Sequence, residues 1–163
     1  MALEPGSILI SAPSMDDPLF EKVVLLLTEV NDNGATGFVI NQLFDRRFNE
    51  LTEFRHSTPL PMFAGGPVEK ESLFFLHSRP DLVPDGTLVR DGIFYGGDFR
   101  KAVSLVNNKG LGENEIKLFV GYSGWDAGQL EDELREGSWI PVFPLQSPVF
   151  GLSVNLWEEL RNL

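Results

Sequence analysis

Residues 121–126, Gly-Tyr-Ser-Gly-Trp-Asp, have the residue types of a nucleophile site. Ser123 stands between a predicted strand and a predicted helix, where the nucleophile elbow of α/β-hydrolases lies. That elbow requires a glycine two residues after the serine, where this chain has Trp125, and a histidine further along the chain. Both histidines, His56 and His77, precede Ser123. We interpret Ser123 as a structural hydroxyl. Nucleophilic catalysis is the alternative, because convergent triads use other orders.

The same glycines precede a predicted helix that ends at Gly137, and a helix N-terminus could hold a phosphate group. No lysine follows in the P-loop pattern, and Asp126 occupies the expected N-cap position. Gln129 stands three residues later, which is the spacing of a capping box. The acidic residues 131–133 fan out around the helix, as on a solvated face, and do not converge on one ion. We predict neither a metal ion nor a cofactor.

His77 ends a predicted buried strand at residues 73–76. We interpret it as a hydrogen-bonded histidine at the edge of the core. General-base catalysis, with Asp98 or Glu69 orienting the ring, is the alternative. The glycine blocks 65–66 and 121–128 indicate positive φ angles or close backbone approach, so we predict a ligand site around them. The candidate ligand-binding residues are Asn41, Gly65, Gly66, His77, Ser123, Trp125, Asp126 and Gln129.

The chain has 163 residues, no cysteine and a net charge of -11, which together predict one domain spanning residues 1–163. The absence of cysteine excludes disulfides and thiolate chemistry and fits the cytoplasm. No apolar run approaches the length of a membrane span, and the first residues have no basic character, so we expect neither an anchor nor a signal peptide. The negative charge disfavours direct contact with nucleic acid. An unidentified protein or a small ligand is the expected partner, and the oligomeric state does not follow from these residues.

Short apolar runs bounded by turn residues predict strands, and amphipathic stretches predict helices. Asn33-Gly34 lies between two apolar runs, which predicts an antiparallel hairpin with a primed turn. Asp98 is a predicted helix cap. The predicted strands are 7–10, 23–28, 37–40, 73–76, 88–89, 93–95, 116–122 and 139–143, and the predicted helices are 48–54, 99–106, 126–137 and 154–160.

Several blocks in fixed order give the chain a family resemblance. They are residues 6–13, 34–41, 65–68, His77, residues 121–131 and Trp139. Together they resemble the YqgE/AlgH family of bacterial proteins over most of the chain. Ordered motifs over such a span are far more specific than a single glycine pattern.

The resemblance implies an α/β fold of the α+β type, with a mixed, largely antiparallel, bifurcated sheet that has barrel-like closure and is surrounded by helices. It carries no established activity, since the family is described as uncharacterised or as transcriptional regulators. We therefore expect a non-catalytic regulatory or interaction protein. An enzyme of unknown class, with a cleft between the two glycine blocks, is the alternative.

Overall fold

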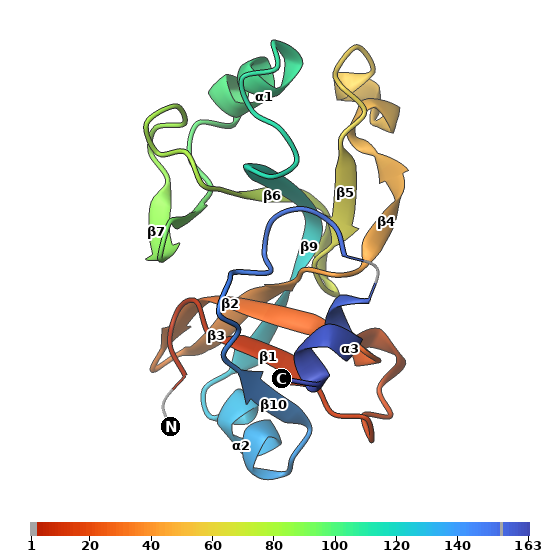
Figure 1. The fold of residues 1–163 in the computed structure, drawn as a ribbon, viewed down its shortest axis with the longest axis vertical. Coiled ribbons are helices and arrows are strands. Elements are labelled where there is room, and N and C mark those ends of the chain that lie inside the picture. The colour runs from red at the N-terminus through yellow and green to blue at the C-terminus, as the bar shows by residue number, and fades with distance from the viewer. Residues whose placement is uncertain (1–2, 154) are drawn as a thin grey trace.

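A computed structural model describes residues 3–153 and 155–163. Its central element is β9, Ile116–Asp126, a strand of 11 residues that passes through the upper and the lower half of the molecule (Figure 1). The first six residues of β9 are buried because both faces of the strand are covered: Phe119 packs in one apolar cluster, and Leu118 and Val120 pack in another. The other strands are arranged around this one.

The strands form a sheet with the order β10-β1-β2-β3-β9-β6-β8-β7, while β5 joins β4 to β9. The pairings are antiparallel except that of β5 with β9. The largely antiparallel α+β architecture is therefore confirmed. The remaining strands are β1 (Ile8–Ser11), β2 (Val24–Asn31), β3 (Gly34–Val39), β4 (Leu43–Arg47), β5 (Pro61–Ala64), β6 (Val68–His77), β7 (Thr87–Arg90), β8 (Ile93–Tyr95) and β10 (Trp139–Val142).

The sheet divides at β9, which pairs with β5 over residues 118–120 and with β3 over residues 123–126. The path of strands ends at β10 and β7, and these two edges do not pair with each other. The predicted barrel-like closure is therefore wrong. Closure would require a further ladder along β10, and this strand contains Pro141, which has no N–H group to donate.

Three α-helices lie within the described residues: α1 (Phe99–Asn107), α2 (Gln129–Arg135) and α3 (Leu156–Arg161). The predicted cap of α1 is confirmed, because the Asp98 carboxylate accepts a hydrogen bond from the Lys101 N–H. Val154, the first residue of the last predicted helix, lies outside the described residues. Three short 3-10 turns complete the elements, Pro18–Phe20, Phe48–Glu50 and Thr52–Phe54.

The predicted helix at residues 48–54 is wrong. Two 3-10 turns occupy this segment, and Leu51 between them has an extended backbone with a ψ of 134°. Phe48 is nevertheless buried and stacks on Phe54. The spacing of apolar residues thus predicted which side chains face the core. It did not predict the backbone form, because two 3-10 turns direct these side chains inward as one helix would.

The hairpin of β2 and β3 is confirmed, but its turn differs from the prediction. Asp32 and Asn33 form the loop, and neither has a positive φ. The positive φ of 132° falls on Gly34, the first residue of β3. Residues 123–125 were also predicted to connect a strand to a helix, but β9 continues to Asp126 and the chain turns at residues 127–128.

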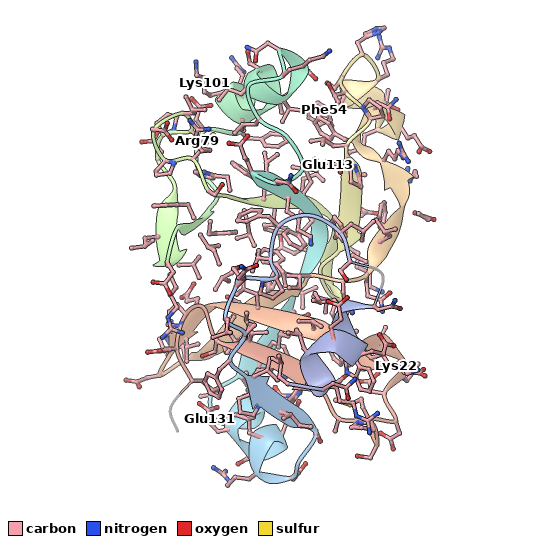
Figure 2. All side chains as sticks on the ribbon, in the orientation of Figure 1. Lys22, Phe54, Arg79, Lys101, Glu113 and Glu131 are labelled. Carbon is pink, nitrogen blue, oxygen red and sulfur yellow. The ribbon has the colours of Figure 1, made fainter. Side chains whose placement is uncertain are left out.

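Buried apolar side chains form three clusters on the faces of this divided sheet. Figure 2 shows apolar side chains filling both halves, with Lys22, Lys101 and Glu131 at the periphery. Within residues 3–153 and 155–163, no helix has the length and apolar character needed to cross a membrane.

Candidate functional site

The two glycine blocks pack backbone against backbone. A Cβ atom added to Gly121, which has a φ of +75°, would lie 2.5 Å from the carbonyl oxygen of Gly66. The Gly65 N–H donates to the Val120 carbonyl at 3.0 Å, and the Ser123 hydroxyl donates to the Gly65 carbonyl at the same distance. We call residues 65–66 and 121–123 the glycine junction. Its glycines leave no room for side chains between the two segments.

Ser123 is completely buried in the glycine junction. Its hydroxyl is used in the bond to the Gly65 carbonyl, and neither histidine is among its hydrogen-bond partners. His77 lies at the other end of the β6–β9 ladder, opposite Ile116. A Ser–His pair is therefore not assembled here, and the hydroxyl ties one glycine block to the other.

His77 is buried and its two ring nitrogens contact backbone groups. Nε2 lies 3.1 Å from the Gly96 carbonyl, and the Arg79 N–H donates to Nδ1 at 3.1 Å. These partners assign a neutral ring with the proton on Nε2. Burial lowers the pKa of His77, opposed in part by the bond to Gly96. Neither Asp98 nor Glu69, the orienting groups of the catalytic alternative, is among these partners, and the Asp98 carboxylate caps α1.

Trp125 and Trp139 converge on one carboxylate of α2. Their indole N–H groups both donate to Oε1 of Glu133, at 3.2 and 3.0 Å. The predicted capping box is only half present: the Gln129 side chain accepts from the Asp126 N–H at 3.0 Å, but Gly128 occupies the N-cap position. This region therefore fixes α2 against the sheet.

Asn41 links the start of β2 to the end of β3. Its side-chain oxygen accepts from the Val24 N–H at 2.9 Å, and its amide nitrogen donates to the Lys22 carbonyl at 3.1 Å. The eight candidate residues thus divide between the glycine junction, the adjoining end of β9 with α2, and two separate positions at Asn41 and His77. Ligand binding by them stays a prediction.

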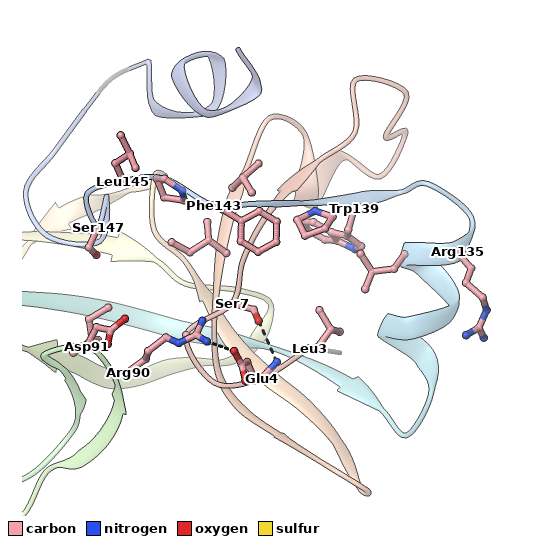
Figure 3. A pocket seen from close by; sticks show the side chains of 17 residues that line it. Leu3, Glu4, Ser7, Arg90, Asp91, Arg135, Trp139, Phe143, Leu145 and Ser147 are labelled. Carbon is pink, nitrogen blue, oxygen red and sulfur yellow. Dashed lines mark hydrogen bonds and ion pairs between the residues drawn. The ribbon is translucent and has the colours of Figure 1, made fainter. Parts of the chain in front are cut away.

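An open hollow lies elsewhere, between the edge strand β10 and the turn that joins β7 to β8 (Figure 3). Its volume is about 710 Å³, which falls in the range of small-molecule sites. The lining side chains come from five parts of the chain: the N-terminal segment, β1, the β7–β8 region, α2, and β10 with the loop after it. They include Leu3, Ile8, Ile93, Leu134, Trp139, Pro141, Val142, Phe143, Pro144 and Leu145.

The hollow has an apolar part and a polar part. Phe143 and Trp139 lie along one wall, whereas Arg90, Glu4 and Asp91 lie together at the other side (Figure 3). Arg90 forms an ion pair with Glu4. The Arg90 side chain also covers Gly6, where an added Cβ would lie 2.5 Å from its Cδ. The arrangement suits a ligand with an apolar body and a polar group.

This hollow was not predicted, although the chain carries a signal for it. Residues 139–145 are all apolar and include two prolines. An edge strand buries one face, so an unbroken apolar run must leave some side chains outside. Phe143 is 71% exposed and Leu145 is fully exposed.

Lys117 was not among the predicted site residues either; it stands two residues before Phe119 on the same face of β9. Lys117 is only 4% exposed. Its Nζ donates to the carbonyls of Val149 and Gly151 at 2.8 and 3.1 Å and lies 4.0 Å from the centre of the Phe63 ring. Burial lowers its pKa to about 7. A charged residue in phase with core positions was the available signal.

The remaining acidic groups do not assemble a metal site. Within the described part of the chain, no three side chains of the histidine, cysteine or carboxylate type are placed to hold an ion. Near His77, Arg79 forms ion pairs with both Asp81 and Glu115, so these two carboxylates are engaged with a guanidinium group. The Arg79 guanidinium lowers the pKa of the Asp81 carboxyl.

Comparison with known proteins identifies the family. Residues 8–163 match the family model DUF179, described as AlgH-like. The chain belongs to the AlgH-like family. A UPF0301 protein of Chlorobium limicola is 36% identical over 148 residues, which cover 91% of this chain and 79% of that protein. A UPF0301 protein of Cytophaga hutchinsonii is 41% identical over 140 residues, which cover 85% of this chain and 76% of the relative.

Two solved structures resemble this AlgH-like chain. The solution structure of AlgH from Pseudomonas aeruginosa has a TM-score of 0.71 and 26% identity, covering 91% of this chain and 81% of that one. A crystal structure of a Corynebacterium diphtheriae protein has a TM-score of 0.79 and 23% identity, covering 100% of this chain and 88% of that one. The latter likeness concerns the fold alone.

Proposed function

We propose that this AlgH-like protein is a non-catalytic binding protein that takes a small ligand with an apolar body into the hollow beside β10. The observation that carries the proposal is the exposed apolar wall, with Phe143 71% exposed above a volume of about 710 Å³. Exposed apolar surface gathered in a concave site is typical of binding sites and is costly to leave facing water.

The state of the reactive groups supports binding without catalysis. Ser123 and His77 are both buried, and each is engaged with backbone groups. A general base needs a proton to abstract within hydrogen-bond reach, and a nucleophile needs a base beside it. Neither condition is met by these two residues. An enzyme with its site at the glycine junction is therefore the weaker alternative.

The family is described in part as transcriptional regulators. In this proposal, such a regulatory role would act through the bound ligand or a protein partner. The net charge of -11 repels the phosphate backbone, so direct contact with DNA is disfavoured. A mobility shift of duplex DNA by the purified protein at physiological salt would contradict this part of the proposal.

The binding test uses N-phenyl-1-naphthylamine, a neutral fluorophore whose emission rises in apolar surroundings. We expect saturable binding to the wild-type protein and a dissociation constant about tenfold higher for Phe143→Ser, because one aromatic contact is lost. Leu43→Ser is the matched control, since Leu43 is 53% exposed on β4 and does not line the hollow. Absence of binding, or an equal loss in both variants, would refute the proposed site.

A further inference from the structure

The loop after β10 connects the hollow to the centre of the sheet. From β10 the chain rises across β9 and returns to α3 (Figure 1). Its first part, with Phe143, Leu145 and Ser147, lines the hollow. Its second part, residues 149–151, lies on the Lys117 ammonium group. We call residues 143–153 the strap.

Apolar packing and neutral hydrogen bonds also hold the second part of the strap, where Phe150 packs against a core cluster. The Val149 side chain is completely buried in the same cluster as Phe63 and Phe119. The Gly151 N–H donates to the Glu113 carbonyl at 3.2 Å, and the Val149 N–H donates to the Ser147 hydroxyl at 3.4 Å. The two bonds from Lys117 Nζ are the charge-assisted ones, and such bonds are about twice as strong as neutral ones.

The position of Lys117 is costly for a lysine. Its charge is buried beside a phenyl ring, and no carboxylate of the described residues forms an ion pair with it. A buried charge without a counter-ion destabilises the fold unless its hydrogen bonds compensate. Here the compensation comes largely from two carbonyl groups of the strap. The strap carbonyls and the Lys117 ammonium group are therefore each other's hydrogen-bond partners.

We propose that Lys117 is a positioning residue of the hollow: its ammonium group holds residues 149–151 against β9 and thereby fixes residues 143–147 as one wall of the binding site. This inference rests on the proposed function of the hollow. Lys117 itself does not line the hollow, so it acts on a ligand only through the strap.

Amide hydrogen exchange tests the strap without any ligand. In Lys117→Met we expect exchange at Val149 and Gly151 to be at least about tenfold faster than in the wild type, because two charge-assisted bonds are lost. The control is Lys22→Met. Lys22 is exposed and donates no hydrogen bond to the strap, and its Nζ lies 5.8 Å from the ring centre of Trp157 in α3. Unchanged exchange in Lys117→Met would overturn the proposal.

Binding of N-phenyl-1-naphthylamine gives the second readout. We expect a dissociation constant about tenfold higher in Lys117→Met, and a partial recovery in Lys117→Gln, which keeps two N–H donors. Faster exchange with unchanged affinity would overturn the positioning role. Absence of binding to the wild type would instead refute the proposed function, while the exchange data would still decide whether Lys117 holds the strap.

A measurement on the wild-type chain covers the case in which the variant does not fold. Acetic anhydride labels exposed amines, and mass spectrometry gives the rate at each lysine. The rates are compared per unprotonated amine, because the lowered pKa of Lys117 increases the fraction of it that can react. On this scale we expect Lys117 to react at least about tenfold more slowly than the exposed Lys22, because the strap covers it. Equal rates would show that the strap does not stay docked and would overturn the proposal.

Discussion

The glycine junction and the hollow contrast in how their space is used. At the junction, backbone atoms of two segments meet where no Cβ fits, and the Ser123 hydroxyl is consumed in a bond to Gly65. At the hollow, large apolar side chains such as Phe143 stand open around a volume of about 710 Å³. The junction has the sequence pattern that suggests a site, whereas the hollow has the surface that a ligand could contact.

A glycine-rich block therefore indicates close approach of two backbones more directly than it indicates a functional site. Residues 121–126 lie within β9, and residues 65–66 lie between β5 and β6, at the place where the partner of β9 changes from β5 to β3. A sheet that changes partners along one strand requires backbones to approach closely there, and glycine permits this. The binding surface arises elsewhere, at a sheet edge.

The largest effect is expected from a side chain added inside the glycine junction. Gly121→Ala should lower the free energy of unfolding by about 3 to 5 kcal/mol, because the added Cβ meets the Gly66 carbonyl and the positive φ disfavours any other residue. Gly128→Ala is the control: its φ is +81°, but no atom lies within 4 Å of the added Cβ, so we expect about 1 kcal/mol. Urea unfolding followed by tryptophan fluorescence measures both. Equal costs would mean that the junction is not close-packed.

The second prediction concerns the pH dependence that Lys117 gives to the strap region. Burial lowers the pKa of this ammonium from 10.5 to about 7, so between these values the unfolded chain binds the proton more strongly. Raising the pH through this window therefore stabilises the folded state, by up to about 1.4 kcal/mol per pH unit. Phe63 and two strap carbonyls face the amine, and Glu113 lines the same recess.

This pH dependence is measured as the free energy of unfolding in urea, for the wild type and for Lys117→Met at pH 7 and pH 9. The difference between the two proteins isolates Lys117 from the other titrating groups. We expect the wild type to gain about 2 to 3 kcal/mol relative to the variant on going to pH 9. A difference that does not change with pH would contradict the lowered pKa.

The smallest effect is expected from Ser123→Ala, which sharpens the comparison. The loss of one buried hydrogen bond should lower the free energy of unfolding by about 1 kcal/mol, because the Gly65 carbonyl retains its bond from the Val39 N–H. The affinity for N-phenyl-1-naphthylamine should stay within about twofold of the wild type. Ser14→Ala, an exposed change, is the control for stability. A large loss of binding with little loss of stability would place the ligand at the junction.

Local patterns predicted most elements correctly. The hairpin of β2 and β3, the Asp98 cap of α1 and the stop of α2 at Gly137, which has a φ of +83°, follow from residues close together in the chain. The segment at residues 48–54 was predicted as a helix from the spacing of its apolar residues, but two 3-10 turns bury Phe48 and half-bury Phe54 with the same spacing. Periodicity reports which side chains face inward and does not distinguish these two forms.

The candidate site was harder to predict than the fold. The glycine blocks indicated where backbones approach, and they do meet at Gly66 and Gly121. Of the other candidates, His77 lies at the far end of the β6–β9 ladder, and Asn41 is bonded to the start of β2. Both positions depend on strand register. The hollow draws on five separate parts of the chain, so the apolar run at residues 139–145 indicates one exposed wall and not the cavity that the other parts complete.

The sequence by itself determined the family, the acidic surface, most strands and the two places where only glycine fits, because these depend on residue type and short-range spacing. The tertiary structure decided that the sheet stays open between β10 and β7, that Ser123 is closed off, and that Lys117 lies beneath the strap. Each of these depends on which distant segments pair with β9, and the free energy of that pairing is shared among residues far apart in the chain.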